Sequence, residues 1–520
     1  MKINILKYSV LVLFCLSAFK SIGQNNSNKN IILIITDDHA YQAISAYNDR
    51  FAKIAPTPNI DKLANEGVRF DRSYVGNSIC APSRATMLTG KHSHLNGITT
   101  LKEKFDGSQP TIANILQKNG YETSYFGKWH LKNKPVGFSN WDVLIGQGDY
   151  YNSDFKTEEG ITRSKGYVTD VITDKAINWL DNQREKEKPF MMIVGHKAPH
   201  ANWLPPVKYL TSFEDVEIPE PKNLFDIHSS NGLGTKETDM TIEEMPMGWY
   251  CQLWTEKKEQ PNRYEDLGGS LWKRAYGRLS IEEKASFDKV FNAENESFTK
   301  ANLKGKELIR WKYQRIMKNY LGCIKSVDDN VGRITDYVKK AGLEDNTLII
   351  YASDQGLFLG EHGWYDKRMM YEEAFRTPLI AYCPSIRTKG VVSKQLVQNI
   401  DYAPTMLDFA GIEIPSEMQG ESLMPIIKNK KAKNWRKSLF YQYYDYPGGH
   451  DIQKHQGVVT KRYKLIYFYE INEYEFYDLK KDPSEMKNEY SNSKYKKAIS
   501  ELKKELIKLR KTYKVPTIES

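Results

Sequence analysis

Apolar runs and helical patterns alternate along most of the chain. The run from Ile31 to Thr36 is apolar on both faces, which is typical of a central strand in a parallel sheet. Further strand patterns cover residues 68–74, 121–126, 190–194 and 348–352, and helical patterns cover 60–66, 111–119, 169–183 and 310–340. This alternation predicts an α/β fold with a large, doubly wound, mixed but mostly parallel sheet flanked by helices.

Two regions lack this alternation of strand and helix patterns. Residues 204–308 have no clear period, and we interpret them as a long insertion with short helices that shapes a pocket. Beyond about Lys430, four short strand patterns and a Lys-rich amphipathic pattern over 495–512 predict a small antiparallel sheet with a helix on one face. We therefore expect a main domain over residues 24–430 and a C-terminal subdomain over 431–520.

The first 23 residues have the pattern of a cleaved signal peptide. Lys2 and Lys7 precede an apolar run too short to span a bilayer comfortably, and small residues stand before residue 24. Cys15 lies inside that run behind the bulky Phe14, which disfavours a lipid-attachment site. We expect the mature protein to act in the periplasm or outside the cell, without stable membrane insertion.

Composition narrows the class of protein. Of 520 residues, 40% are hydrophobic and 27% charged, which is a globular composition rather than a disordered one. The net charge of +10 is compatible with an anionic polymer as partner, but its commonest cause is a solvated Lys-rich surface, and we expect no nucleic-acid partner. Five cysteines are too few for a disulfide scaffold.

Acidic residues follow two of the predicted strands. Asp37 and Asp38 come directly after the first strand, and Asp354 and Gln355 follow the strand at 348–352. Such residues could cap the next segment, but the repeated arrangement favours a cation, since adjacent buried carboxylates are costly to desolvate. Oxygen ligands without a local cluster of His and Cys indicate Ca²⁺ or Mg²⁺ rather than zinc.

A motif between these acids carries a family resemblance. The segment from Cys80 to Gly90 contains Cys-x-Pro-Ser-Arg followed by Ala-x-x-x-Thr-Gly. In this motif, and in the order of strands, acids and basic residues from about Asn30 to Pro483, the chain resembles the type I sulfatases of the alkaline phosphatase superfamily. The resemblance implies a sulfuric ester hydrolase in which a maturating enzyme oxidises Cys80 to formylglycine.

The chemistry explains why such a residue is useful. A hydrated aldehyde offers one oxygen to attack sulfur and a second to expel sulfate, so no water has to attack a sulfate ester. Pro82 suggests that Cys80 stands at or just before a helix N-terminus, where backbone N–H groups favour an anion. Without the motif, we would interpret Cys80 as a small buried hydrophobic residue.

The resemblance also implies roles for basic residues after successive strands. Arg84 and Lys128 would hold the hydrated aldehyde and the sulfate, and Lys367 would contact the sulfate. His130 would be the base that releases sulfate from the enzyme. His200 would protonate the leaving sugar oxygen.

A neighbouring histidine competes for the role of acid. His196 lies close to His200 in the sequence and could protonate the leaving group instead, although we prefer His200. Taken singly, these histidines and Lys367 would more often be ordinary loop or surface residues. Only their order after successive strands supports the assignment.

The same resemblance implies that Asp37, Asp38, Asp354 and Gln355 bind Ca²⁺ together with formylglycine 80. Better-known members of the family have Asn or His where this chain has Gln355, so the longer amide could shift the coordination. His39 and His362 are weaker candidates, expected to contact the metal ligands rather than the metal.

The substrate is expected to be a sulfated polysaccharide or oligosaccharide. The chain looks like bacterial sulfatases that act on sulfated glycans, including the N-acetylglucosamine-6-sulfatase-like group; ulvan, carrageenan and glycosaminoglycans all stay open. Aromatic residues of the insertion could stack on sugar rings or simply pack, namely Trp249, Trp254 and Trp272.

Two alternatives to a glycan sulfatase stay open. They are a phosphate mono- or diester hydrolase of the same superfamily and a secreted glycan-binding protein that never matures at Cys80. The states of Cys251, Cys323 and Cys383 are left open.

Overall fold

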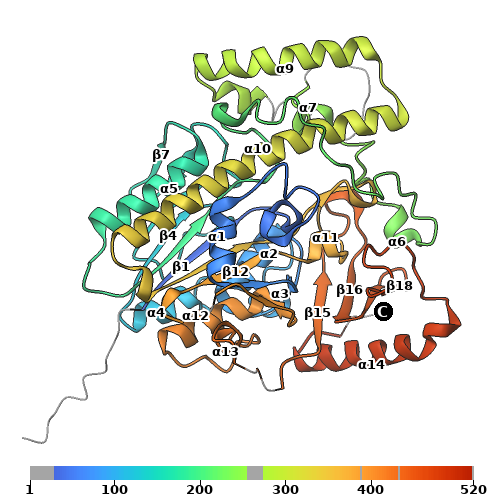
Figure 1. The fold of residues 1–520 in the computed structure, drawn as a ribbon. Coiled ribbons are helices and arrows are strands. Elements are labelled where there is room, and N and C mark those ends of the chain that lie inside the picture. The colour runs from blue at the N-terminus through green and yellow to red at the C-terminus, as the bar shows by residue number, and fades with distance from the viewer. Residues whose placement is uncertain (1–28, 254–272, 387–388, 431, 433, 518–520) are drawn as a thin grey trace, which may run out of the picture.

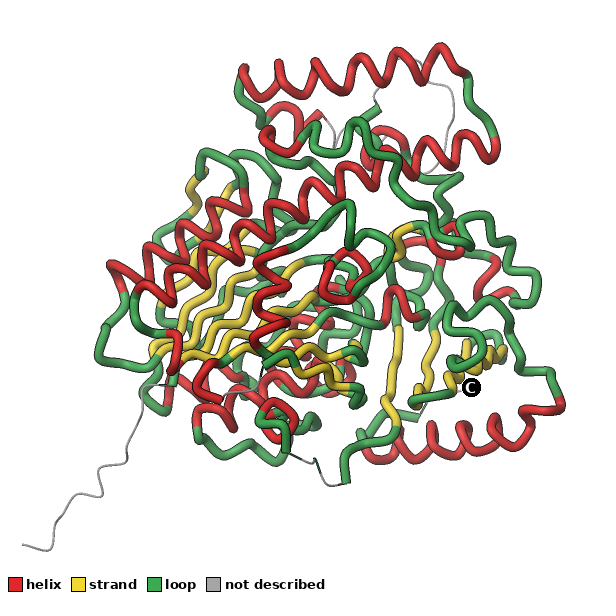
Figure 2. Tube along the Cα trace, in the orientation of Figure 1, coloured by secondary structure: helices red, strands yellow, loops and turns green. Residues whose placement is uncertain are grey.

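A ten-stranded sheet forms the centre of the molecule (Figures 1 and 2). The computed structural model describes residues 29–253, 273–386, 389–430, 432 and 434–517. The strands of the sheet lie in the order β13 (Val391–Ser393), β2 (Val68–Phe70), β12 (Leu379–Tyr382), β9 (Thr347–Ser353), β1 (Asn30–Thr36), β8 (Phe190–Gly195), β4 (Glu122–Gly127), β5 (Asn140–Leu144), β6 (Asp154–Lys156) and β7 (Ile161–Arg163).

The middle of this sheet is parallel. Strands β9, β1, β8, β4 and β5 run in one direction, so their carboxyl ends meet at one edge. Strand β12 is antiparallel to both its neighbours, and β6 and β7 add an antiparallel margin at the other side. This arrangement confirms the predicted mixed sheet.

Helices cover both faces of the sheet, which explains the continuous apolar run of β1. Ile32 and Ile34 pack into one core with α1 (Pro58–Glu66), α5 (Val168–Asn178) and α10 (Gly305–Lys340). Ile31 and Leu33 pack into a second core on the opposite face, because successive side chains of a strand alternate. That face is covered by α2 (Cys80–Thr89), α4 (Ile112–Lys118), α12 (Tyr402–Ala410) and α13 (Met424–Ile427).

Some local predictions were wrong. The segment 68–74 divides into β2 and a separate short strand, β3 (Ser73–Tyr74), which pairs with β14 (Val397–Gln398). The insertion contains short helices, α6 (Leu233–Lys236) and α7 (Met247–Tyr250), but also the 21-residue helix α9 (Ile281–Ala301). A capping box formed by Ser280 and Glu283 starts α9, and α9 lies alongside part of α10 at the top of Figure 1.

The C-terminal segment forms the predicted small antiparallel sheet. Its strands are β15 (Ser438–Tyr443), β16 (His455–Thr460), β17 (Tyr463–Phe468) and β18 (Glu473–Asp478), paired in sequence order. The amphipathic helix α14 (Lys496–Thr512) covers one face through Ile499, Leu502, Leu506 and Leu509. The other face packs against the main sheet region through a separate core that includes Tyr441 and Phe375.

Four further short helices and strands lie among the described residues. They are α3 (Ser93–Asn96), β10 (Phe358–Leu359), β11 (Tyr365–Asp366) and α11 (Glu372–Phe375). Strands β10 and β11 pair as a short antiparallel ladder, joined by a turn at Glu361–Gly363. This ladder lies directly before Lys367.

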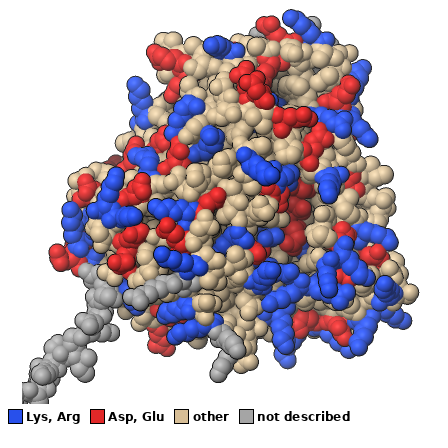
Figure 3. Space-filling model, viewed as in Figure 1, with Lys and Arg blue, Asp and Glu red and all other residues tan. Residues whose placement is uncertain are grey.

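The surface and the cysteines complete the general picture. Figure 3 shows basic and acidic side chains interspersed over one face of the molecule. No helix of the described residues combines the length and apolarity needed to cross a membrane. The four described cysteines are buried and free: Cys80, Cys251, Cys323 and Cys383. The expected signal peptide, with Cys15, lies outside the described residues.

Candidate active site

Three carboxylates meet where β1 and β9 end. Asp37, Asp38 and Asp354 each offer an oxygen, and these oxygens lie within 4.8 Å of one another. The backbone N–H of Asp354 donates to the carbonyl of Thr36 at 3.0 Å, and the N–H of Asp38 donates to Oδ1 of Asp354 at 3.3 Å. All three side chains are buried, so the parallel pairing of two strands forces three acids together away from water.

Cys80 lies beside this cluster as the first residue of α2, close to where Pro82 predicts a helix start. Its Sγ lies 3.4 Å from Nζ of Lys367 and 3.5 Å from Nε2 of Gln355. Burial, followed by the charge of Asp37, raises the pKa of the Cys80 thiol to about 12. Without a bound cation, this environment favours the protonated thiol, which is a poor nucleophile.

Each acid also has a cationic partner. Nε of Arg84 lies 2.9 Å from Asp354, and Nζ of Lys367 lies 2.5 and 2.7 Å from the two oxygens of Asp38. Lys128, at the end of β4, pairs with Asp37. Three carboxylates and three cations leave this group without net formal charge, whereas a bound divalent cation would leave two positive charges for an anionic substrate.

The donor set of this cluster fits a hard divalent cation. Burial, then the charge of Asp37, raises the pKa of Asp354 to about 7, which reflects carboxylates that crowd each other. The buried Oε1 of Gln355 has no hydrogen-bond partner, while its Nε2 donates to Asp38. A half-turn of this amide would offer its oxygen beside the carboxylates, giving the all-oxygen set that Ca²⁺ and Mg²⁺ prefer.

Two of the predicted histidines stand at the same edge of the sheet. His200 Nδ1 lies 2.6 Å from the carbonyl oxygen of Ala201, so this nitrogen carries the hydrogen and Nε2 is left 3.7 Å from Asp38 Oδ2. His130 has a positive φ of 60° and a buried Nδ1 without a hydrogen-bond partner. Burial lowers the pKa of both rings well below the ordinary histidine value, so both are neutral in the free site.

The side chains of the other histidines considered from the sequence have different surroundings. His196 is fully buried, and both its ring nitrogens lack hydrogen-bond partners. His39 Nδ1 contacts the hydroxyl of Tyr351 at 2.6 Å. His362 Nδ1 contacts Asp226 at 3.0 Å, so its side chain pairs with the insertion rather than with the acid cluster.

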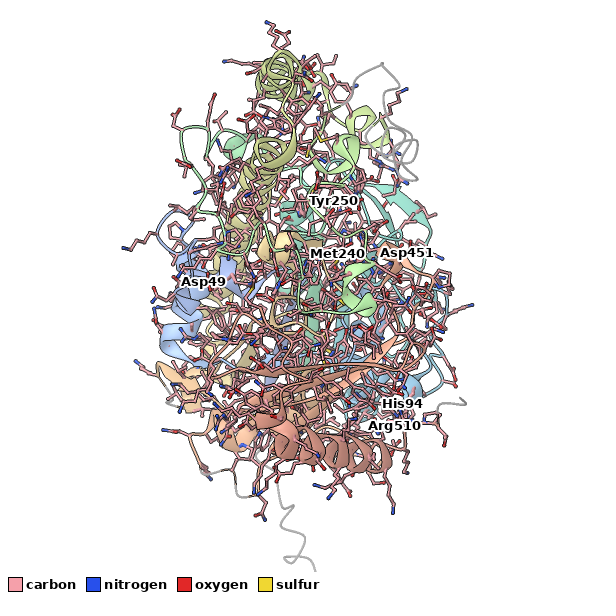
Figure 4. The ribbon with its side chains drawn as sticks, turned by 90° about the vertical axis from the view of Figure 1, so that its right-hand side faces the viewer. Asp49, His94, Met240, Tyr250, Asp451 and Arg510 are labelled. Carbon is pink, nitrogen blue, oxygen red and sulfur yellow. The ribbon has the colours of Figure 1, made fainter. Side chains whose placement is uncertain are left out.

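A cavity of about 170 Å³ opens above Cys80. Its walls come from strand ends, from the insertion and from the segment after β11: Asp38, Ile79, Cys80, Leu101, Gln147, His200, Ala201, Trp203, Trp249, Tyr250, Leu357, Asp366, Lys367 and Arg368. Trp249 thus lies at the cavity, whereas Trp254 and Trp272 fall outside the described residues. Figure 4 labels Tyr250, with Met240 of the insertion and Asp451 of the C-terminal segment below it in that view.

Sequence reasoning missed a charged group in the cavity wall. Asp366 lies 2.7 Å from Arg368 and 2.9 Å from Nε2 of His450, and all three have positive φ. Positive φ outside glycine is uncommon and tends to gather at functional sites. Asp366 and Arg368 flank Lys367 and could have been noticed for that reason, but His450 comes from the C-terminal segment and no local pattern marks it.

Lys197 is a second residue for which no role was predicted. It is buried, and its Nζ lies 4.7 Å from the centre of the Tyr150 ring. Burial, followed by the charge of Lys128, lowers the pKa of Lys197 to about 8. Such an amine exchanges a proton near neutral pH more readily than an exposed lysine.

Comparison with known families decides the assignment. A model described as "Sulfatase" matches residues 29–412, which is well over half of the chain. The chain belongs to the sulfatase family. A second model, "N-sulphoglucosamine sulphohydrolase, C-terminal", matches residues 360–512 of this sulfatase.

Individual relatives agree with the family. The sulfatase is 45% identical over 501 residues to an N-acetylglucosamine-6-O-sulfatase of Bacteroides thetaiotaomicron, covering 94% of this chain and 88% of that protein. It is 26% identical to an arylsulfatase of Clostridium perfringens over 92% and 94% of the two chains. A solved structure described as a complex with its substrate D-glucosamine-2-N,6-O-disulfate superposes with a TM-score of 0.89 at 45% identity, covering 94% of this chain and 98% of the other.

Proposed function

We propose that this sulfatase removes the 6-O-sulfate from a terminal glucosamine or N-acetylglucosamine residue of a sulfated glycan. The observation that carries the proposal is the 45% identity, over nearly the whole chain, to an N-acetylglucosamine-6-O-sulfatase and to a structure bound to a 6-O-sulfated glucosamine. This choice favours amino sugars of the glycosaminoglycan type over ulvan and carrageenan.

The size of the cavity supports action at a chain end. Its volume of about 170 Å³ is smaller than the roughly 300–1,000 Å³ usual for pockets that bind drug-sized ligands. It therefore suits a single sugar ring with its sulfate, and the rest of the glycan would extend toward solvent.

Cys80 is proposed to act as formylglycine, made by a maturating enzyme. The raised pKa of the Cys80 thiol supports this, because a protonated thiol would neither attack sulfur nor release sulfate afterwards. The hydrated aldehyde supplies one oxygen for attack and a second whose proton can be removed to expel sulfate.

The cationic side chains around residue 80 would hold the sulfate. Lys367 and Lys128 each neutralise an acid in the free site, and both lie where a bound dication would release them for the sulfate oxygens. Arg84 bridges Asp354 and the carbonyl oxygen of Lys128 (2.6 Å), so it orients the start of α2 against the end of β4. These groups are in place before substrate arrives, which is the efficient arrangement for stabilising developing charge.

The two histidines are proposed to divide the proton transfers. His200 lines the cavity and would protonate the departing sugar oxygen through Nε2. An arriving sulfate would raise the pKa of this ring, because a nearby negative charge favours the imidazolium. His130 is kept neutral by burial and by Lys128, and a neutral ring can serve as the base that removes a proton from residue 80.

A calcium ion is proposed to complete the site. Asp37, Asp38, Asp354 and Gln355 would hold it beside residue 80. A bound dication supplies charge that stabilises the ionised carboxylates and attracts the sulfate.

Recognition of the sugar is assigned to Asp366 and Arg368, which line the cavity. Their ion pair offers both acceptors and donors to sugar hydroxyls. Both ring nitrogens of His450 are bonded, to Asp239 and Asp366, so this ring holds Asp366 in place. Trp249 and Tyr250 add aromatic surface from the insertion. The proposed catalytic domain, residues 24–430, and subdomain, residues 431–520, would thus share one site in a secreted or periplasmic enzyme.

Desulfation of defined monosaccharides tests this proposal. We expect N-acetylglucosamine 6-sulfate to be cleaved at least about 100-fold faster, as kcat/KM, than N-acetylgalactosamine 6-sulfate, because a misplaced hydroxyl leaves buried polar groups unpaired. Arg368→Ala should reduce kcat/KM for the sugar far more than for an aryl sulfate. Equal rates on both sugars, or equal losses on both substrate classes, would contradict the assigned specificity.

A further inference from the structure

A second group of metal-ligating side chains lies outside the catalytic cavity. Asp226 and His228 belong to the insertion, in the loop before α6, and His362 belongs to the turn between β10 and β11. One oxygen of Asp226 and one nitrogen from each histidine lie within 4.8 Å of one another. Two segments far apart in the sequence therefore direct three ligand atoms at one point.

The hydrogen bond of His228 fixes the tautomer of its neutral ring. Nε2 lies 3.0 Å from the carbonyl oxygen of His362, and a carbonyl only accepts, so Nε2 carries the hydrogen. Nδ1 then bears a lone pair, and it faces Oδ2 of Asp226 at 3.5 Å. A cation between these two electron-rich atoms, either a metal ion or a proton, would relieve their repulsion.

Two of the three ligand separations are close to those around a tetrahedral metal. Oδ2 of Asp226 lies 3.0 Å from Nδ1 of His362 and 3.5 Å from Nδ1 of His228. Ligands at the usual 2.0–2.1 Å from zinc in a tetrahedral arrangement are separated by about 3.3 Å. A backbone carbonyl that receives the far ring N–H, as at His228, is a common way to orient a metal-bound imidazole.

The surroundings hold this arrangement and leave it accessible. The ring of His228 stacks on Trp364, with centroids 4.3 Å apart. Oδ1 of Asp226 accepts the backbone N–H of His228 at 3.0 Å, which leaves Oδ2 for another partner. His362 is almost completely buried, whereas the side chains of Asp226 and His228 are each 11% exposed, so this edge of the group borders solvent.

We infer that Asp226, His228 and His362 bind one divalent transition-metal ion, with zinc favoured, at a site separate from the catalytic centre. Two imidazoles with one carboxylate suit zinc and its neighbours rather than calcium. The ion would join the insertion to the β10–β11 turn, and Lys367 follows β11 directly. Its role is structural, because it would stabilise the cavity wall without contacting substrate.

Cobalt binding tests this inference without reference to activity. The protein is the full mature chain without a polyhistidine tag, saturated with Ca²⁺ and carrying Cys80→Ser to remove the Cys80 thiol as a competing ligand. We expect one tightly bound Co²⁺ with visible absorption bands, displaced by Zn²⁺. His228→Gln should weaken Co²⁺ binding at least tenfold, whereas the matched control His94→Gln should not. His94 lies near Arg510 (Figure 4) and contacts the carbonyl oxygen of Tyr513 instead.

A ligand exchange makes the test specific. His228→Cys should retain Co²⁺ and add a sulfur-to-cobalt charge-transfer band in the near ultraviolet, which only direct ligation by residue 228 produces. Absence of a stoichiometric Co²⁺ band in the parent protein would overturn the inference. So would a band that persists unchanged in His228→Gln, because the metal would then lie elsewhere.

Discussion

Two regions of this sulfatase bury carboxylates, and they do so in opposite ways. In the C-terminal sheet, Glu475 accepts hydrogen bonds from four neutral donors at 2.6–3.0 Å, namely Asn231, Thr235, Tyr371 and Tyr477. At the ends of β1 and β9, three carboxylates crowd one point, and the amide oxygen of Gln355 beside them has no partner.

The difference separates the acids proposed to be functional from a structural one. Burial raises the pKa of both Glu475 and Asp354, so neither burial nor a raised pKa is informative alone. Glu475 has a full set of donors and ties the insertion to the C-terminal sheet. The acids around Asp354 are paired with cations, but three of them crowd one point and the amide oxygen of Gln355 beside them has no partner, as expected of groups arranged for a cation.

The largest expected effect comes from breaking the crowded cluster. Asp354→Asn removes a proposed calcium ligand and leaves the buried Arg84 without its ion partner, so we expect kcat/KM to fall by about 1,000-fold, equivalent to several kcal/mol. Exhaustive chelation of the unsubstituted enzyme should give a similar loss that Ca²⁺ reverses. Full activity in protein shown by elemental analysis to be free of metal would contradict the calcium assignment.

The proposed acid gives a smaller and more selective effect. His200→Ala should reduce kcat by about 100-fold on a sugar sulfate, whose leaving alkoxide needs a proton. On an aryl sulfate with a good leaving group we expect less than about tenfold loss. Parallel losses on both substrates would argue that His200 positions substrate instead of donating a proton.

The matched substitution in the C-terminal sheet should leave activity almost unchanged. Glu475→Gln makes the same acid-to-amide exchange as Asp354→Asn, but its partners are neutral and lie outside the cavity. We expect kcat/KM within about twofold of the parent and a free energy of unfolding lower by about 1–3 kcal/mol, measured by denaturant titration. A large loss of activity without loss of stability would contradict the assignment of Glu475 as a structural carboxylate.

Much of the fold could be predicted because its pattern is local. The two-sided apolar run of β1 predicts helices on both faces, and the structure has them. Helix α9 was not predicted. Ser280 and Glu283, which form its capping box, were a signal for its start, but its many polar residues obscured the spacing of the apolar positions. The antiparallel direction of β12 could not be predicted, because the four apolar residues of this strand do not indicate the direction in which it pairs with its neighbours.

In the site, too, residues marked by a local pattern could be predicted and contacts that depend on tertiary packing could not. Asp37, Asp38 and Asp354 could be predicted because each directly follows a strand, and parallel strands bring their ends together. The contact between Asp366 and His450 could not, because it depends on how the C-terminal sheet packs against the cavity. The same holds for His362, whose ring contacts Asp226 in the insertion instead of the proposed calcium ligands.

The most direct test of the account is the mass of the Cys80 peptide from enzyme that is demonstrably active and was produced in a host with a maturating enzyme. The account predicts a peptide that has lost one sulfur and two hydrogens and gained one oxygen, in a fraction that rises in proportion to specific activity. Fully active protein in which that peptide still carries an unmodified thiol would contradict it.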